Sequence, residues 1–304
     1  MLARRLLPEF RQLLEKEKIP QGDEILSCFY DCYLPFAGWL ADCHKDKPLV
    51  IGVNGAQGSG KSTLTHILAT LLEKGHDKRI VSLSIDDLYK TRQQRQEMAD
   101  SIHPLLATRG VPGTHDVDMG LELFASLKGD QSAQELSVPR FNKAIDDRHD
   151  KADWDKVRTP VDIIIFEGWC VGSIAEDDES LDRPINNLEA DEDTQGFWRQ
   201  FINNQLSGPY QQLFSHIDIL VMLDIPDMEY VYKWRSLQEE KLRTSVAGED
   251  VDNSHHIMSA ENLDRFIMHY ERITRANLRE MPSRADIVLK LNADHQISKV
   301  VSGL

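Results

Sequence analysis

The stretch "GVNGAQGSGKST" (residues 52–63) decides the fold class of this chain. Within it, residues 55–62 fit the pattern G-x-x-x-x-G-K-[ST] at every fixed position. The preceding run "PLVIGV" is apolar and rich in β-branched residues, which predicts a buried strand. After Lys61, leucine and isoleucine recur at helical spacing. A strand, a glycine-rich loop and a helix in this order predict a loop that holds nucleotide phosphates.

Each residue type in this loop has a physical role in phosphate binding. Glycines allow the backbone N–H groups to point inward, and the N-terminus of the following helix adds positive potential. Lys61 is expected to reach the β- and γ-phosphates, and the Ser62 hydroxyl is expected to hold Mg²⁺. The residues expected to bind the nucleotide are Gly55, Ala56, Gln57, Gly58, Ser59, Gly60, Lys61, Ser62 and Thr63.

The composition of the 304 residues is typical of a soluble globular protein with a sizeable core, since 41% are hydrophobic and 28% are charged. The net charge of −15 argues against broad binding of nucleic acid or of an anionic membrane, because both need a basic surface. No apolar run approaches the ~18 residues of a membrane span. A small basic pocket for an anionic substrate is compatible with this charge. The oligomeric state is not indicated.

The four cysteines form no C-x-x-C pair and suggest no disulfide framework. They favour a reducing compartment, and we expect a cytoplasmic location. Near the N-terminus, charged residues between positions 9 and 16 interrupt any signal-peptide core. Apolar residues at helical spacing in residues 2–14 therefore predict a helix that docks onto the protein, with an amphipathic targeting helix as the alternative.

Apolar runs alternate with helical patterns along the chain, which predicts an α/β fold. Such alternation favours a mainly parallel sheet covered by helices on both faces. We expect an N-terminal helical extension of two helices over residues 1–47 and one catalytic domain over residues 48–304. Residues 173–194 are strongly acidic, which predicts an exposed insertion with possible disorder. The five expected strands lie in residues 48–53, 78–89, 159–169, 216–226 and 285–291, and the clearest helices in 64–75, 117–128, 227–243 and 259–280.

Acidic residues follow two of these strands, where ligands bind in parallel sheets. Asp86 comes directly after the second strand, and a carboxylate there can accept the proton of an acceptor hydroxyl. Glu167 ends the third strand, in the position of an acid beside Mg²⁺, which proteins usually hold through one or two carboxylates, waters and phosphates. The sequence therefore predicts phosphoryl transfer, with Lys61, Asp86 and Glu167 as catalytic residues.

Six motifs in order resemble the D-glycerate 3-kinase family of plants and fungi. They are "GAQGSGKST", "SIDDLY", "TRGVPGTHDVDM", "VPRFNKAIDDR", "IIIFEGW" and "VYKWRSLQEEKLR". More distantly, the chain resembles pantothenate kinases, uridine kinases and phosphoribulokinases. The resemblance covers most of residues 48–291 and implies a P-loop kinase fold with ATP as phosphate donor and Mg²⁺ as cofactor. It also implies that D-glycerate is phosphorylated on its 3-hydroxyl.

The resemblance implies further site residues. Asp86 matches a general base, Glu167 an acid that orients Mg²⁺ through water, and Asp116 a group that contacts substrate hydroxyls, with His115 beside it. Arg148 matches an arginine of uridine kinases, but this chain has Asp146 where those kinases carry a histidine, which argues against a nucleoside acceptor. The relatives have a mobile lid with arginines at the positions of Lys233, Arg235, Lys241 and Arg243. Of these four, Arg235 is the strongest candidate for a catalytic residue.

A small hydroxy acid needs a cation for its carboxylate and hydrogen-bonding groups for its hydroxyls. Arg109, Arg140 and Arg148 are candidates for the first role, and His115 and Asp116 for the second. The expected substrate residues are therefore Asp86, Arg109, His115, Asp116 and Arg148. The expected metal-holding residues are Ser62 and Glu167.

Other functions remain open at this point. A pantothenate- or uridine-type kinase is an alternative within the same enzyme class. A nucleotide-switch ATPase is a less favoured alternative, because residues 142–145 lack the acid of the guanine-specific pattern N-K-x-D. Residues 193–196 match the switch pattern D-x-x-G but follow an acidic loop rather than a strand.

Overall fold

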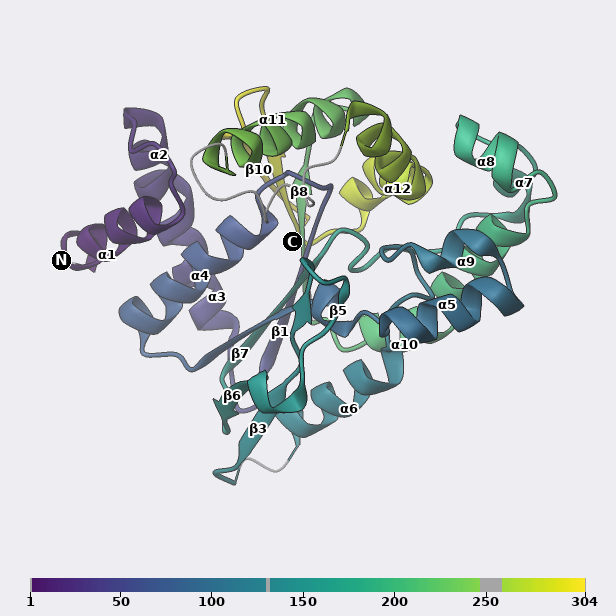
Figure 1. The fold of residues 1–304 in the computed structure, drawn as a ribbon. Helices are drawn as coiled ribbons and strands as arrows, with labels where there is room; N and C mark the ends of the chain where they lie inside the picture. Colours follow the sequence, from purple (N-terminus) through teal and green to yellow (C-terminus); the bar gives the residue numbers. More distant parts are fainter. Residues whose placement is uncertain (1, 130–131, 247–258, 304) are drawn as a thin grey trace.

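The computed structural model describes residues 2–129, 132–246 and 259–303. Within these residues, the main sheet has six strands in the order β10-β9-β8-β1-β7-β2. The strands β9, β8, β1, β7 and β2 are parallel to one another. The edge strand β10 pairs antiparallel with β9 (Figure 1). The strands are β1 (Leu49–Gly55), β2 (Ile80–Ser84), β7 (Ile163–Gly168), β8 (Ile219–Asp224), β9 (Ile287–Leu291) and β10 (Ile297–Ser302).

The five predicted strands are confirmed, but the predicted number of strands is one too few. The strand that the sequence does not reveal is β10, which lies at the edge of the sheet and leaves most of its side chains exposed. A strand with little buried surface carries no apolar run, so its sequence resembles a loop.

The two largest apolar clusters of the described residues lie on opposite faces of the sheet, because successive side chains of a strand point to opposite faces. Ile51 and Val53 of β1 belong to one core, and Val50 belongs to the other. Figure 1 shows the same division, with α1, α3 and α4 on one side of the sheet and α6, α9 and α10 on the other. These helices are α1 (Leu2–Lys16), α3 (Leu34–Cys43), α4 (Lys61–His76), α6 (Val117–Lys128), α9 (Phe197–Ser207) and α10 (Pro209–Phe214).

The N-terminal extension forms two helical runs, as predicted. The second run is continuous from α2 (Asp23–Cys28) through the π-helical segment η1 (Phe29–Tyr33) to α3. Leu6, Phe10 and Leu14 of α1 are buried in the same core as β1 and α4. The extension therefore shares its hydrophobic core with the sheet.

Most residues of the acidic segment are exposed, in line with the predicted exposed insertion, but the segment forms two short helices where its composition allows disorder. It forms α7 (Asp178–Leu181) and α8 (Asn187–Glu192) and buries Leu181, Leu188 and Glu189. Arg272 forms two hydrogen bonds with the Glu189 carboxylate, at 2.8 and 2.6 Å. Pairing with arginine explains how a segment with so many acids can pack against α12 (Ala260–Glu280).

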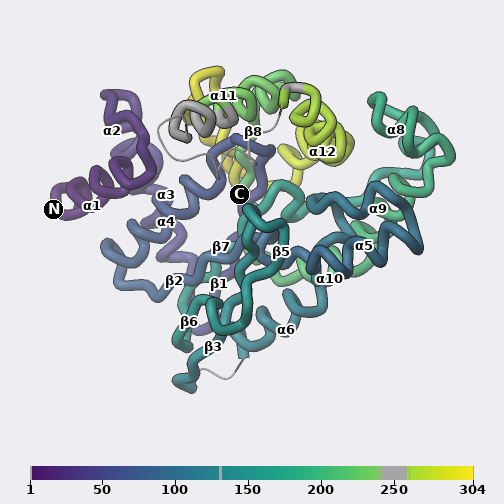
Figure 2. Tube along the Cα trace, viewed as in Figure 1, coloured from purple at the N-terminus to yellow at the C-terminus, as the bar shows by residue number. Residues whose placement is uncertain are grey.

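The segment between α6 and β7 forms two small antiparallel strand pairs. One pairs β3 (Glu135–Val138) with β6 (Asp155–Arg158), and the other pairs β4 (Phe141–Asn142) with β5 (Asp147–Arg148). Figure 2 follows the same path as a tube, with β3, β5 and β6 in teal. The remaining elements are η2 (Ile85–Leu88), α5 (Arg92–Ser101), η3 (Pro104–Ala107), η4 (Lys151–Asp153), α11 (Met228–Val246) and η6 (Met281–Ser283).

Candidate active site

The glycine-rich loop lies between β1 and α4, as predicted. Gly58 and Gly60 have φ angles of +79° and +91°, a backbone region that favours glycine. The Lys61 ammonium donates a hydrogen bond to the Ala56 carbonyl at 3.1 Å, so the side chain folds back over the loop. Burial of this ammonium lowers its pKa, while the Glu167 and Asp86 carboxylates act in the opposite direction.

Buried polar atoms of the loop fit a phosphate-bearing ligand. Both amide atoms of Gln57 and the Ser59 hydroxyl are buried and have no hydrogen-bond partner among the described residues. Buried polar groups in native proteins are almost always paired, so unpaired ones beside a phosphate-binding loop indicate that a polar ligand completes them. The loop residues therefore fit a nucleotide.

Glu167 lies at the end of β7, next to the start of α4. The Ser62 hydroxyl donates a hydrogen bond to the Glu167 carboxylate at 3.1 Å, so the two predicted metal-holding residues are brought together. Burial raises the pKa of Glu167, and the Lys61 ammonium opposes this shift. Among the described residues, His, Cys, Asp and Glu side chains form no group of three that could hold a metal ion. That is compatible with Mg²⁺, which usually keeps waters and uses few protein ligands.

Asp86 is the second residue of the short 3₁₀-helical turn η2, which directly follows β2. Its carboxylate accepts a hydrogen bond from the Tyr89 hydroxyl at 3.0 Å and from the Lys143 ammonium at 2.5 Å. Burial acts to raise the pKa of Asp86, but the charge and hydrogen bond of Lys143 and the other neighbouring groups outweigh it and leave the pKa lowered. Asp86 is therefore held as a carboxylate.

A cavity of about 320 Å³ lies beside the loop and collects these groups. Its charged lining consists of four cationic side chains and two carboxylates, which favours an anionic ligand. Aromatic rings of Tyr89, Trp169, Phe266 and Tyr270 complete the walls. The charged residues are Lys61, Arg109, Lys143, Arg235, Asp86 and Glu167.

Lys143 is the site residue that the sequence does not predict. It lies 57 residues after Asp86, in the turn between β4 and β5. The two strands of that hairpin have only two residues each, which is too few to give a strand pattern. An available signal is the position of Lys143 inside the "VPRFNKAIDDR" motif.

Arg109 reaches the cavity and is held by Asp146, at the other end of the same turn. The Arg109 guanidinium forms an ion pair with the Asp146 carboxylate and lies 5.7 Å from the centre of the Phe141 ring. Asp146 is also paired with the fully buried Arg95 at 2.9 Å. Asp146 therefore fixes an arginine in the cavity.

Arg235 also reaches the cavity, from α11. Its guanidinium carbon lies 5.7 Å from the centre of the Phe266 ring of α12. The Lys233 ammonium lies over the Tyr230 ring instead. The side chains of Lys241 and Arg243 lie outside the described part of the chain.

Arg140 is engaged elsewhere, because its guanidinium pairs with Asp87 at 2.7 Å and with Asp155 at 2.7 Å. It is not among the described residues that line the cavity. Its expected contact with a substrate carboxylate has no support in this arrangement.

His115 is buried behind Tyr89 and is not part of the described cavity lining. Its ring stacks on that of Tyr89, with 4.4 Å between the ring centres, and its Nδ1 atom is 2.6 Å from the Tyr210 hydroxyl. Burial lowers the pKa of His115 to about 3, so the imidazole is neutral. Its predicted contact with substrate remains a prediction, and its visible contacts support Tyr89.

Asp116 and Arg148 also lie behind Tyr89. Asp116 caps α6 by accepting a hydrogen bond from the Met119 N–H, and it forms an ion pair with Arg148 at 3.3 Å. The Arg148 guanidinium donates to the Tyr89 carbonyl at 2.8 Å. Neither is among the described residues that line the cavity, so direct substrate contact remains a prediction for both.

A second cavity of about 570 Å³ adjoins the same loop. Its walls come from the loop at Gly58, Ser59, Gly60 and Thr63, from residues 17–25 of the N-terminal extension and from the turn between β9 and β10. In that turn, His295 lies 2.7 Å from the Gly58 carbonyl through its Nε2 atom and stacks on Trp234 of α11. The loop thus has a cavity on each of two sides.

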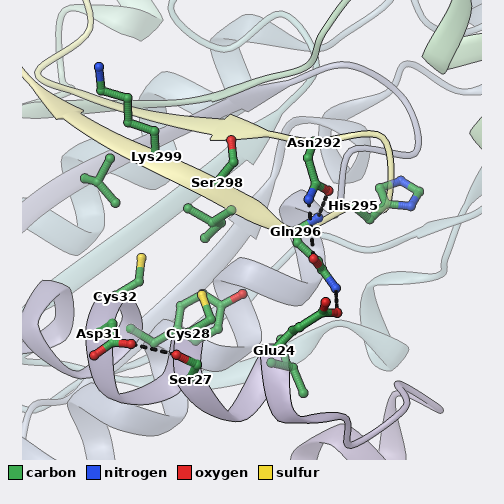
Figure 3. A pocket seen from close by; sticks show the side chains of 14 residues that line it. Glu24, Ser27, Cys28, Asp31, Cys32, Asn292, His295, Gln296, Ser298 and Lys299 are labelled. Carbon is green, nitrogen blue, oxygen red and sulfur yellow. Dashed lines mark hydrogen bonds between the residues drawn. The ribbon is translucent and has the colours of Figure 1, made fainter.

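A hydrogen-bonded chain joins the extension to this turn (Figure 3). Asn292 donates to the Gln296 side chain at 3.3 Å, and Gln296 donates to the Glu24 carboxylate. Figure 3 shows these hydrogen-bonded residues in the wall of a neighbouring cavity of about 440 Å³, which is also lined by Cys28 and Cys32 of the extension.

Among the described residues, no helix combines the length and apolarity that crossing a bilayer requires.

Comparison with known proteins gives the relatives of the sequence. The family profile "KAP family P-loop domain" matches residues 32–159. The uncharacterized kinase mug58 of Schizosaccharomyces pombe is 34% identical over 238 residues, which cover 74% of this chain and 79% of that protein. The chloroplastic D-glycerate 3-kinase of Arabidopsis thaliana is 30% identical over 312 residues, which cover 94% of this chain. The match spans 63% of the length of the plant enzyme.

A solved structure supports the fold. The D-glycerate 3-kinase from Cryptococcus neoformans superposes with a TM-score of 0.71 and covers 92% of this chain and 100% of that one. The two sequences are 24% identical, so this likeness concerns the fold.

Proposed function

The chain belongs to the family of ATP-dependent P-loop kinases of small molecules that includes the D-glycerate 3-kinases, and we propose that its own acceptor is D-glycerate. The observation that carries this proposal is the cavity beside the loop. It combines a carboxylate held in its ionised form, Asp86, with four cationic side chains. A small acidic alcohol fits such a lining better than a neutral one.

The donor side of the proposed site consists of the loop and of Glu167. Lys61 and the inward-facing N–H groups would hold the β- and γ-phosphates, and the nucleoside would lie in the second cavity. Ser62 and Glu167 would hold Mg²⁺, directly or through water. When bound, the metal ion supplies positive charge that offsets the charge of the phosphate oxygens.

On the acceptor side, Asp86 would accept the proton of the attacking hydroxyl. In phosphoryl transfer most of the catalytic work is positioning and charge stabilisation, and a carboxylate beside the acceptor is a recurring part. Arg109, fixed by Asp146, would bind the substrate carboxylate, and Arg235 would approach the transferring phosphoryl group. His115, Asp116 and Arg148 would act by fixing Tyr89, which binds Asp86.

The position of phosphorylation is part of this proposal. Two relatives are named D-glycerate 3-kinases, which supports transfer to the 3-hydroxyl. We also propose a cytoplasmic location, since the four cysteines are free thiols and fit a reducing compartment.

An acceptor panel tests the proposed function. The purified protein is given ATP, Mg²⁺ and one acceptor at a time: D-glycerate, L-glycerate, lactate, glycerol, pantothenate or uridine. We expect ADP release to require the acceptor and kcat/KM to be highest for D-glycerate, with 3-phosphoglycerate identified by NMR. A site whose polar groups match substrate hydroxyls rejects analogues that lack them. Lys61→Ala is the control that removes transfer. A higher kcat/KM for pantothenate or uridine would overturn the assignment of D-glycerate.

A further inference from the structure

The ion pair between Lys143 and Asp86 conflicts with the role proposed for Asp86. One carboxylate oxygen accepts from the Tyr89 hydroxyl, and the other accepts from the Lys143 ammonium at 2.5 Å. A general base must present an oxygen to the hydroxyl proton within hydrogen-bond distance. As long as Lys143 is bound there, the acceptor hydroxyl must share the oxygen with a cation, whose charge stabilises the ionised carboxylate and so opposes its uptake of the hydroxyl proton.

Lys143 differs from the other cations near the acceptor in how firmly it is held. Its side chain is 61% exposed, and a flexible four-carbon stem connects its ammonium to the turn after β4. Arg109, by contrast, is paired with Asp146, which is itself fixed by the buried Arg95. The Lys143 ammonium can therefore move by rotation of its own side chain.

The charges around Asp86 determine what could draw Lys143 away. The other charged groups that line the cavity are Lys61, Arg109, Arg235 and Glu167. Three of these are cations that would repel the ammonium, and Glu167 is already bound to Ser62. Under the proposed function two incoming anions approach the site: the ATP phosphates, which Lys61 and the loop would bind, and a negatively charged group on the acceptor, which would supply the partner for Lys143.

We propose that the Lys143 ammonium leaves Asp86 during the reaction and joins Arg109 in binding the carboxylate of an anionic acceptor. Asp86 then accepts a hydrogen bond from the acceptor hydroxyl. As the hydroxyl oxygen bonds to the γ-phosphorus, its proton passes to Asp86, and the bond between that phosphorus and the β,γ-bridging oxygen breaks. The electron pair of the broken bond leaves with ADP. This inference rests on the proposed kinase function and adds that the acceptor is selected by its negative charge.

The test compares two acceptors in two proteins. D-Glyceramide keeps both hydroxyls of D-glycerate and replaces the carboxylate by a neutral amide. In the wild type we expect kcat/KM for D-glycerate to exceed that for D-glyceramide by roughly 10- to 100-fold, the range of a charged hydrogen bond. In Lys143→Gln we expect kcat/KM for D-glycerate to fall by a similar factor, whereas the value for D-glyceramide should rise, because this neutral acceptor cannot draw the ammonium away from Asp86 in the wild type.

Two controls make the result specific. Ile145→Ala changes a 61% exposed side chain in the same turn and should leave both values unchanged. Lys143→Arg keeps the charge and should retain part of the preference for D-glycerate; it also serves if Lys143→Gln does not fold. An equal fall for both acceptors in Lys143→Gln would overturn the exchange, because a merely structural lysine affects them alike.

The same experiment separates this inference from the proposed function. If the wild type phosphorylates neither compound, D-glycerate is the wrong acceptor. Lys143→Gln is then measured on the best acceptor of the panel. The exchange stands if that acceptor is an anion whose turnover requires Lys143, and it fails if the acceptor is neutral.

Discussion

Asp86 and Asp87 are adjacent acids, but their carboxylates have different hydrogen-bond partners. Asp86 faces the cavity, where Tyr89 and Lys143 bind it. Asp87 points the other way, accepts from Arg140 and from the Phe141 N–H, and so anchors the start of β4. The two aspartates thus form a natural pair of test and control.

Asp86→Asn keeps the shape of the side chain but removes its ability to accept a proton. General-base assistance typically contributes ~10²–10⁴-fold, so we expect kcat to fall by that factor while ATP binding persists. Steady-state kinetics with D-glycerate and a separate ATP-binding titration measure the two effects. Asp87→Asn should mainly lower the melting temperature. A loss of kcat under threefold in Asp86→Asn would show that Asp86 is structural.

His115 makes the stability of the fold depend on pH. Burial lowers its pKa to about 3 in the folded protein, against the ordinary 6.5. The unfolded chain therefore binds a proton more readily than the folded one between these values. The contribution of neutral His115 to the free energy of unfolding is complete above pH 6.5 and is lost as the pH falls towards 3.

When the pH is lowered from 7.5 to 5, we expect the titration of His115 to reduce the free energy of unfolding by about 2 kcal/mol, at ~1.4 kcal/mol per pH unit below pH 6.5. His115→Phe keeps a ring against Tyr89 but cannot titrate. Denaturant unfolding of both proteins at the two pH values measures this loss. Between pH 7.5 and pH 5, the variant should lose about 2 kcal/mol less unfolding free energy than the wild type. The variant is expected to be less stable at both pH values, because Tyr210 loses its partner. Equal losses in the two proteins would contradict the assignment.

Among the elements, the sequence reveals those that carry apolar surface. The five parallel strands and α4 are predictable from buried runs and from the loop between β1 and α4. The edge strand β10 and the hairpin β4–β5 are not, since they bury little and follow no apolar period. Lys143 is hidden for the same reason, because only the hairpin brings it to Asp86.

The acidic segment shows a second limit of prediction from the sequence. Its composition predicts exposure with possible disorder, and most of its residues are exposed, but some of its acids pair with arginines far along the chain and the segment is partly helical. Glu189 is completely buried and holds Arg272, which lies 83 residues away. A composition rule counts charges in one segment and does not include partners from another element.

Glu189→Ala should therefore destabilise the protein strongly. It leaves Arg272, 11% exposed, without its bidentate partner, and breaking a buried ion pair costs about 3–5 kcal/mol of unfolding free energy. Denaturant unfolding measures this loss. Glu192→Ala is the matched control, since Glu192 pairs with Arg265 on the surface and such a pair contributes at most about 1 kcal/mol. Equal effects of the two substitutions would contradict a buried structural role for Glu189.

Across the whole molecule, the glycine-rich loop connects two cavities with different surroundings. The acceptor side is cationic although the whole chain has a net charge of −15. The other side is closed by the N-terminal extension and by the turn that carries His295 and Gln296. In that turn His295 contacts the loop, and Gln296 contacts Glu24 of α2. Under the proposed function, the extension is therefore part of the donor site.

Glu24→Ala tests this connection without removing the extension. The variant loses the bond that joins α2 to Gln296, next to the expected position of the nucleoside. We expect KM for ATP to rise roughly three- to tenfold, the net size of an ordinary hydrogen bond, because this one is exposed and acts on the nucleotide indirectly, while KM for D-glycerate stays unchanged. Ser27→Ala is the control on the same helix, because its hydroxyl bonds to Asp31 and not to the turn. If KM for ATP stays at the wild-type value, or if both KM values rise together, α2 does not act on the donor side.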